Sequence, residues 1–365
     1  RFRQNLNHLL KNKNQVLDTL TNNYKLNYNK KKISKYKKSK NFRIIGMGGS
    51  ILGTKAIYDF LNHKIKKNFF FVDNLKPTQK KENRSYSNII VSKSGNTLET
   101  IVNTNILIKK NEKNIFITEN KQNYLNLLAK KLRAEIIHHN NYIGGRYSVL
   151  SEVGMLPAEL MGLDPSKFKQ FNSLIKNKRF IKSLLSSVAS SISFIKKEKF
   201  NSIILNYDEK SQNLFKWYQQ LIAESLGKKN NGILPVISLM PRDNHSLMQL
   251  YLDGFKNNFF TFFYVNENKS DKIKNNQILD QIKFLKKKNI NNILYSQKKA
   301  TENIFRKKNI PFRSFEIKQR DEKTLGELFS FFILETILIG DALKINPYNQ
   351  PAVELIKQET KNLLI

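Results

Sequence analysis

The sequence contains no cysteine, and this absence excludes several kinds of chemistry at once. Disulfide bonds, thiolate metal sites and cysteine nucleophiles all require a thiol. Disulfides are typical of oxidising compartments, so a chain of 365 residues without cysteine is most simply placed in the cytoplasm. Histidine is also scarce, with five residues, and the pair His138–His139 has no partner at zinc-ligand spacing. We therefore expect no metal site.

Long apolar runs are absent as well. The longest candidate, Leu328–Ile339 (LFSFFILETILI), is too short to cross a bilayer and carries Glu335. The opening residues, RFRQNLNHLLKNKNQ, lack the apolar stretch of a signal peptide. We expect no interaction with a membrane. An apolar content of 40% is nevertheless enough to build cores, and a chain of this length suits two domains.

Acidic residues are few, which leaves a formal net charge of +35. Such a surplus is compatible with a polyanionic partner such as nucleic acid. Most of the basic residues are lysines spread along the chain among Asn and Ile, whereas nucleic-acid-binding proteins gather basic residues on one element. The densest run, Asn29–Lys40 (NKKKISKYKKSK), is interpreted as a solvated surface segment. We do not expect nucleic-acid binding, but a positive field would attract a small anionic ligand.

Short apolar runs alternate with turns and helical stretches along most of the chain. Strands are predicted at 42–45, 69–72, 87–91, 114–118, 134–138, 202–206, 259–265, 293–295 and 312–317. Helices are predicted at 8–20, 51–61, 164–199, 214–227, 324–343 and 351–364. Strands separated by helices predict parallel sheets with right-handed crossovers. The sequence thus predicts an α/β fold in which each of two domains is a doubly wound, mainly parallel sheet flanked by helices.

The same pattern divides the chain into four expected segments. Residues 1–40 form a helical, basic segment, and residues 41–165 form the first α/β domain. A helical crossover at 166–199 leads to the second α/β domain at 200–365, which ends in two helices.

Two turns after predicted strands could hold a ligand. GMGGS (Gly46–Ser50) lacks the third glycine of a dinucleotide fingerprint and the acidic residue that would bind a ribose, so a nicotinamide site is not expected. Its glycines allow either a close approach of the backbone to a ligand or simply a tight turn.

The second turn, SKSGNTLET, is more informative. Ser92, Ser94 and Thr97 stand at the start of a helix, together with Lys93 and a glycine. Hydroxyls and free N-terminal amides are suited to a phosphate dianion. Capping of the helix would need only one of these hydroxyls. Two such turns without a Walker lysine motif favour a sugar phosphate over a nucleotide.

At this point the sequence resembles a known family. Both turns resemble those of the sugar isomerase (SIS) domain, and GGRYSVLSEVG resembles a motif of the glucose-6-phosphate isomerase family. Further blocks follow in the family's order: YQQLIAESLGK, DNHSLMQLYLDG and TLGELFSFFILETILIGDALKINPYNQPAVELIK. The resemblance extends over Arg43–Lys357, which is most of the chain. Asn349 and Ala352 depart from it, since the family usually has Asp and Gly there.

The resemblance implies a role for each matching residue. Catalytic roles are implied for Glu224, His245, Lys357 and Arg146, and substrate-binding roles for Gly49, Ser50, Ser92, Lys93, Ser94, Thr97, Gln220 and Gln350. It also implies a homodimer with shared active sites, in which the neighbouring subunit supplies the histidine. The implied activity is the reversible isomerisation of glucose 6-phosphate and fructose 6-phosphate, without a cofactor.

These residue types suit that chemistry. A carboxylate such as Glu224 can move a proton between neighbouring carbons, and Arg146 can stabilise the negative enediolate. His245 titrates in the range needed to open the sugar ring, and Asp243 could orient it. Two alternatives remain open: a dual phosphoglucose/phosphomannose isomerase, and a non-catalytic module that only binds a sugar phosphate.

Overall fold

The computed structural model describes residues 2–11, 14–78, 84–267 and 269–365. Within them, the first sheet consists of five parallel strands in the order β2-β1-β3-β4-β5. These strands are β1 (Asn41–Gly46), β2 (Asn68–Val72), β3 (Ser87–Val91), β4 (Lys113–Glu119) and β5 (Glu135–His139). The second sheet has four parallel strands in the order β7-β6-β8-β9. They are β6 (Asn201–Asn206), β7 (Leu234–Leu239), β8 (Asn258–Val265) and β9 (Phe312–Ile317).

The predicted α/β class, with two parallel sheets flanked by helices, is confirmed. One strand prediction is wrong, because 293–295 lies within the helix α12 (Ile290–Lys307). Its apolar triplet is too short to distinguish the two periods, and a capping box between Asn289 and Asn292 starts the helix. The strand β7 was not predicted, and it contains Pro235. Proline is compatible with β7 because this strand lies at the sheet edge.

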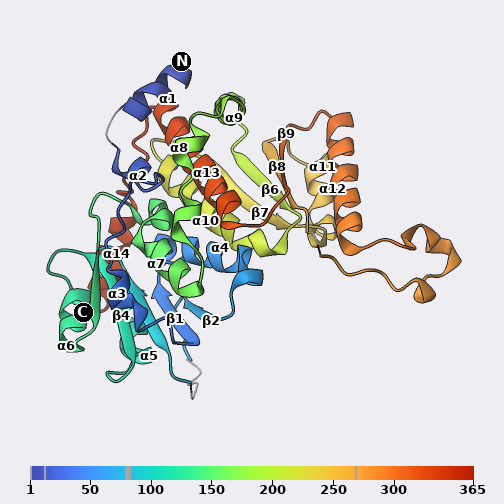
Figure 1. Ribbon diagram of the computed structural model, residues 1–365. Helices are drawn as coiled ribbons and strands as arrows, with labels where there is room; N and C mark the ends of the chain where they lie inside the picture. Colours follow the sequence, from blue (N-terminus) through green and yellow to red (C-terminus); the bar gives the residue numbers. More distant parts are fainter. Residues whose placement is uncertain (1, 12–13, 79–83, 268) are drawn as a thin grey trace.

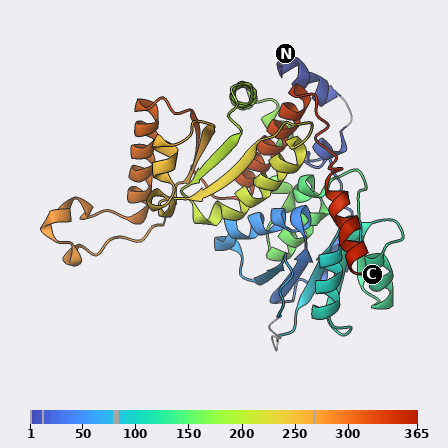
Figure 2. The same cartoon turned by 180° about the vertical axis from the view of Figure 1, so that it is seen from behind.

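Helices form three layers around the two sheets (Figures 1 and 2). The layer between the sheets contains α4 (Leu52–Phe60), α7 (Glu152–Met161), α10 (Gln212–Leu226) and α13 (Glu322–Ala342). The outer face of the first sheet carries α5 (Leu98–Leu107) and α6 (Tyr124–Lys131), and that of the second carries α11 (Met248–Asp253) and α12. The remaining helices are α1 (Phe2–Lys11), α2 (Gln15–Asp18), α3 (Lys30–Ser34), α8 (Phe171–Leu174), α9 (Lys178–Lys196) and α14 (Val353–Leu363).

The central strands are buried on both faces, which explains their continuous apolar runs. In the first sheet, Ile44 and Ile89 point to the middle layer, whereas Ile45 and Ile90 contact α5 and α6. The helix α13 is apolar on nearly all sides because it is packed in the middle layer. Among the described residues, no helix is long and apolar enough to cross a membrane.

The N-terminal segment is packed more tightly than the sequence indicates. Its predicted helix at 8–20 is divided into α1 and α2, and residues 12 and 13 lie outside the described residues. In the basic run, most lysines are exposed as expected, but Ile33 and Tyr36 are buried in the core. Tyr36 also donates to the carbonyl of Asn114 at 3.2 Å. The run is therefore a surface segment that packs against the core through Ile33 and Tyr36.

Lys169 also holds the N-terminal segment, through hydrogen bonds of its side chain. Its side chain is buried, and Nζ donates to the carbonyl oxygens of Thr19 and Leu150. Burial lowers the pKa of Lys169 to about 7, while the carboxylate of Glu152 opposes the shift. A neutral amine keeps two N–H donors, which match the two carbonyl acceptors.

This arrangement predicts a pH-dependent stability. The unfolded chain holds the Lys169 proton up to about pH 10, whereas the folded protein loses it near pH 7. Between these values the unfolded state binds more protons, so the free energy of unfolding should rise with pH by up to about 1.4 kcal/mol per pH unit.

Urea unfolding of the unaltered protein and of Lys169→Met at several pH values measures this rise in the free energy of unfolding. Lys169→Met should lose most of the rise between about pH 7 and pH 10. Lys176→Met, at an exposed position, should retain it. Parallel stability curves for the protein and Lys169→Met would contradict the prediction.

Candidate active site

The first sheet brings the two predicted ligand-binding turns together. In the order β2-β1-β3-β4-β5, the connection from β1 leads toward one edge of the sheet and that from β3 toward the other. The place between β1 and β3 is therefore the switch point of the sheet. Ligands of such sheets bind at the switch point, beyond the carboxyl ends of the strands. Gly46 at the end of β1 is the register partner of Val91 at the end of β3. The turns Gly46–Ser50 and Ser92–Thr97 therefore begin side by side.

The glycines of the first turn are required by close backbone contacts. A Cβ atom on Gly49 would lie 2.2 Å from the carbonyl carbon of Gly145, so these two turns cross at backbone distance. Gly48 has φ +50°, and a Cβ there would lie 2.7 Å from Nε2 of Gln220. Ser50, which is half-buried, follows directly. The turn is thus a junction between the first sheet, the Gly145 turn and α10.

In the second turn, the predicted hydroxyl residues have different surroundings. Ser92 is buried, and its hydroxyl pairs with that of Thr97 at 2.9 Å. Ser94 is exposed, and its hydroxyl accepts from the backbone N–H of Asn96 at 3.2 Å. Thr97 is the N-cap of α5, yet its side chain makes no capping hydrogen bond. The capping alternative therefore does not account for these hydroxyls.

Lys93 is the cation of this turn, and it is paired with a residue that the sequence analysis missed. Its Nζ lies 3.6 Å from Oε1 of Glu119, a buried carboxylate at the end of β4 that also binds Lys121. Burial lowers the pKa of Lys93, the carboxylate of Glu119 opposes the shift, and the charges of Lys121 and, less strongly, Arg146 add to it.

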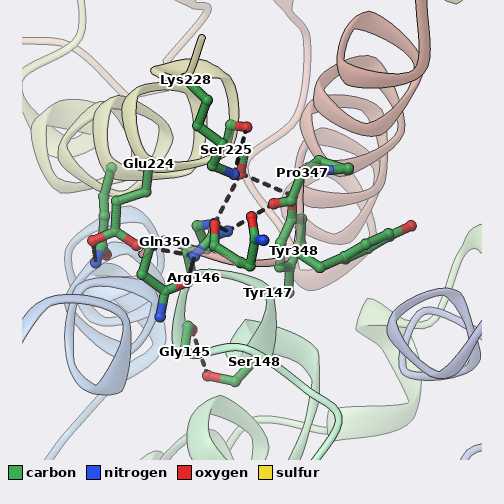
Figure 3. Close-up of polar contacts among 12 residues, drawn as sticks. Gly145, Arg146, Tyr147, Ser148, Glu224, Ser225, Lys228, Pro347, Tyr348 and Gln350 are labelled. Carbon is green, nitrogen blue, oxygen red and sulfur yellow. Dashed lines mark hydrogen bonds and ion pairs between the residues drawn. The ribbon is translucent and has the colours of Figure 1, made fainter. Parts of the chain in front are cut away.

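Arg146 is the centre of the site (Figure 3). It lies in the 3₁₀ helix Gly145–Leu150, and only 1% of its side chain is exposed. Its Nε donates to Ser225 at 2.8 Å, and one terminal nitrogen donates to Glu224 at 3.1 Å and Gln350 at 2.8 Å. The other terminal nitrogen donates to the carbonyls of Pro347 at 2.7 Å and Asn349 at 3.1 Å. These acceptors match the five N–H groups of a guanidinium.

Glu224 lies on the last turn of α10, where two residues hold its carboxylate. Oε2 accepts from Arg146, and Oε1 accepts from Nε2 of Gln220 at 2.9 Å, one helical turn earlier. A third of the Glu224 side chain remains exposed, whereas Arg146 is buried. The arrangement presents an oriented carboxylate toward an opening, which is the geometry required of a general base.

Two predicted catalytic residues lie outside this cluster. His245 is exposed at the end of the 3₁₀ helix Arg242–His245, after β7. Asp243 does not orient it in the described structure, since its oxygens accept from the N–H of Leu239 and the side chains of Arg242 and Ser246. Lys357 is on α14 and pairs at 2.6 Å with Glu354 of the same helix.

Several residues of the site were missed because none of them carries a signal in the sequence alone. Ser225 orients Arg146, and the hydroxyl of Tyr147 lies 2.8 Å from that of Ser225. The indole of Trp217 donates to the carbonyl of Arg146 at 3.0 Å. Lys228 binds the segment around Asn346. The packing of α10 against the Gly145 turn brings Ser225, Tyr147 and Trp217 together, and the chain's return after α13 supplies the partner of Lys228.

Among the described residues, there is no group of three or more side chains that could hold a metal ion. The paired parallel sheets, the two turns at the switch point and the oriented carboxylate define a protein of the SIS class, to which sugar-phosphate isomerases belong.

Comparisons with known proteins agree with this class. The family model described as phosphoglucose isomerase matches residues 10–233. A glucose-6-phosphate isomerase of Methanocaldococcus jannaschii is 34% identical over 88% of this chain and 84% of its own length. The chain belongs to the phosphoglucose isomerase family.

Solved structures show the same fold. A hypothetical protein from Thermus thermophilus matches with a TM-score of 0.83 at 22% identity, over 92% of this chain and 87% of its own. A glucose-6-phosphate isomerase from Chlamydia trachomatis matches with a TM-score of 0.74 at 18% identity, over 95% of this chain and 78% of its own.

The crossing of the two glycine turns can be tested directly. Gly49→Ala places Cβ 2.2 Å from the backbone of Gly145, so Arg146 must shift, and we expect a loss of about 1–3 kcal/mol in the free energy of unfolding. Gly144→Ala is the matched control, because its nearest neighbour would lie at 3.7 Å. Urea unfolding followed by the fluorescence of Trp217 reports both effects. Equal stability of the two variants would show that the crossing is not tightly packed.

Proposed function

We propose that this protein catalyses the reversible isomerisation of glucose 6-phosphate and fructose 6-phosphate in the cytoplasm, as part of glycolysis and gluconeogenesis. The observation that carries the proposal is the carboxylate of Glu224, held by Gln220 and Arg146 beside the two turns at the switch point. Membership of the family and the name of the relative from Methanocaldococcus jannaschii support it.

The site suggests how the substrate is oriented. The phosphate dianion would bind at Ser92–Thr97, with Ser94, the N-terminal amides of α5 and Lys93 as donors. Glu119 would then share Lys93 with the phosphate. Gly49 and Ser50 would allow the sugar chain to cross between the two turns, so that its reacting carbons lie against Glu224.

Glu224 would then act as the base. It takes the proton from C2 of the open-chain aldose, which leaves a cis-enediolate, and returns a proton to C1 to give the ketose. A proton is also exchanged between the two oxygens, so the substrate supplies and receives every atom and no redox cofactor is needed. Arg146 would be a fixed positive charge beside these oxygens. Its terminal nitrogen that donates to Glu224 also donates to the side chain of Gln350.

Ring opening requires a further acid–base pair, for which we propose His245 and Lys357. Because His245 is exposed and apart from Glu224, we infer that a second copy of the chain supplies it. Two exposed apolar surfaces support a homodimer. One is the segment 269–289, which extends away from the body and exposes Leu279 and Phe284 (Figures 1 and 2). The other is α14, which has no buried residue.

The role of Glu224 is tested by Glu224→Gln. The amide keeps the size of the side chain but cannot take a proton, so kcat should fall by about two to four orders of magnitude. Glu209→Gln, at an exposed position before α10, should retain the activity. Fructose 6-phosphate turnover is measured by a coupled assay, and binding by calorimetry.

The outcomes distinguish the alternatives. Undiminished activity of Glu224→Gln would remove Glu224 from its role, and binding without turnover by the unaltered protein would identify a non-catalytic module. Equal turnover of mannose 6-phosphate would favour the dual phosphoglucose/phosphomannose isomerase.

The shared active site predicts complementation between two inactive variants. In a hybrid dimer of Glu224→Gln and His245→Ala, one site combines the intact glutamate of one subunit with the intact histidine of the other. Equimolar refolding should therefore restore about a quarter of the normal activity. Sedimentation of the unaltered protein as a monomer, or no recovery in verified hybrids, would contradict the proposal.

A further inference from the structure

Lys228 connects α10 to the segment Ile345–Gln350, which leads from α13 to α14. It follows the end of α10 by two residues, and its Nζ donates to the carbonyl oxygen of Asn346 at 2.6 Å. The same nitrogen donates at 3.0 Å to the carbonyl of Ser225 in the last turn of the helix (Figure 3). A cation at this end of a helix satisfies a carbonyl that has no partner within the helix.

The segment held by Lys228 also supplies acceptors for Arg146. Arg146 donates to the carbonyls of Pro347 and Asn349 and to the side chain of Gln350. Two cations therefore hold one short segment, Arg146 from the Gly145 turn and Lys228 from the end of α10. Arg146 is buried, whereas Lys228 is only half-buried, so Lys228 is the contact that solvent reaches more readily.

A cavity of about 810 Å³ lies beside these contacts. It is lined by Glu224, Lys228 and Gln350, together with backbone and amide groups of the segment. Displacement of Ile345–Gln350 would therefore change the position of Gln350 and the carbonyl acceptors of Arg146 next to the base.

We propose that Lys228 is a positioning residue of the isomerisation: its ammonium group holds Ile345–Gln350 against α10, and loss of its proton loosens this segment and misaligns Arg146 and Gln350. The inference rests on the proposed function. Ammonium-to-carbonyl bonds are charge-assisted, and a neutral amine at a half-buried position competes poorly with water.

The charges around Lys228 place this titration in an accessible range. The charged groups that face it are Arg146 from the Gly145 turn and Glu224 from α10. In Ile345–Gln350, Lys228 contacts the carbonyl of Asn346, and the one titratable side chain of the segment, Tyr348, is hydrogen-bonded to Asn14 instead. Burial and the charge of Arg146 together lower the pKa of Lys228 to about 8, although the charge of Glu224 opposes the shift. Activity should therefore decline above about pH 8 as Lys228 loses its proton.

Three variants test the proposal through the pH dependence of kcat/KM for fructose 6-phosphate. Lys228→Arg keeps its charge at all accessible pH values, so the decline above about pH 8 should move upward while activity is retained. Lys228→Met should lower kcat about tenfold to a hundredfold and abolish the decline. Lys216→Met, at an exposed position on the same helix, should leave the profile unchanged.

Amide hydrogen exchange of Ile345–Gln350 provides a readout that does not depend on catalysis. Exchange should be faster in Lys228→Met than in the unaltered protein, and Lys228→Arg should restore protection. Unchanged exchange in Lys228→Met, or an unshifted pH profile in Lys228→Arg, would overturn the proposal. If the unaltered protein did not isomerise sugar phosphates, the exchange result would still decide whether Lys228 holds the segment.

Discussion

The buried guanidinium of Arg146 is the interaction on which the site depends. Its acceptors come from two parts of the chain that are far apart in sequence: the end of α10 and the segment after α13. A buried guanidinium with unpaired N–H groups would lower the stability of the fold. The arrangement in which all five acceptors are in place is therefore favoured over any in which some of them are missing. The position of Glu224 therefore follows from the burial of Arg146, and the two must be assembled together.

The packing of α4 against α10 explains why these parts meet. The start of α4 lies beside the end of α10, where Gly48 contacts Gln220, and the end of α4 lies beside the start of α10, where Asn213 donates to Asp59. The two helices are therefore antiparallel, and each reaches the switch point of the other sheet. In the second sheet, that point lies between β6 and β8.

The second switch point is filled by the protein itself. Arg320 is buried there, with Asp208 after β6 at 2.6 Å, Glu267 after β8 at 2.7 Å and the carbonyl of Phe60 at 3.4 Å. An ion pair of this kind occupies the crevice that binds ligands in related sheets. Two similar sheets thus have different tasks: one binds the sugar phosphate in our proposal, and the other supplies Glu224 and is closed by Arg320.

The sequence predicted the elements whose pattern is local. Continuous apolar runs identified eight of the strands, and glycines and hydroxyls marked the two turns. It failed where a local pattern was ambiguous, as at 293–295, or where tertiary position permitted a proline, as in β7. The roles of Ser225 beside Arg146, of Glu119 beside Lys93 and of Lys228 beside Asn346 could not be predicted from composition or spacing, because these are ordinary residues until the fold places them.

In our proposal the site combines a fixed charge with an accessible base. The proposed role of Arg146, to stabilise developing negative charge, requires a group that need not reorganise, and its burial among protein acceptors provides this. As the proposed base, Glu224 must reach a carbon of the substrate, and a third of its side chain is exposed. Gln220 and Arg146 compensate by fixing the carboxylate from both sides. Ile345–Gln350 completes this arrangement, because it carries Gln350 and supplies carbonyl acceptors to both Arg146 and Lys228.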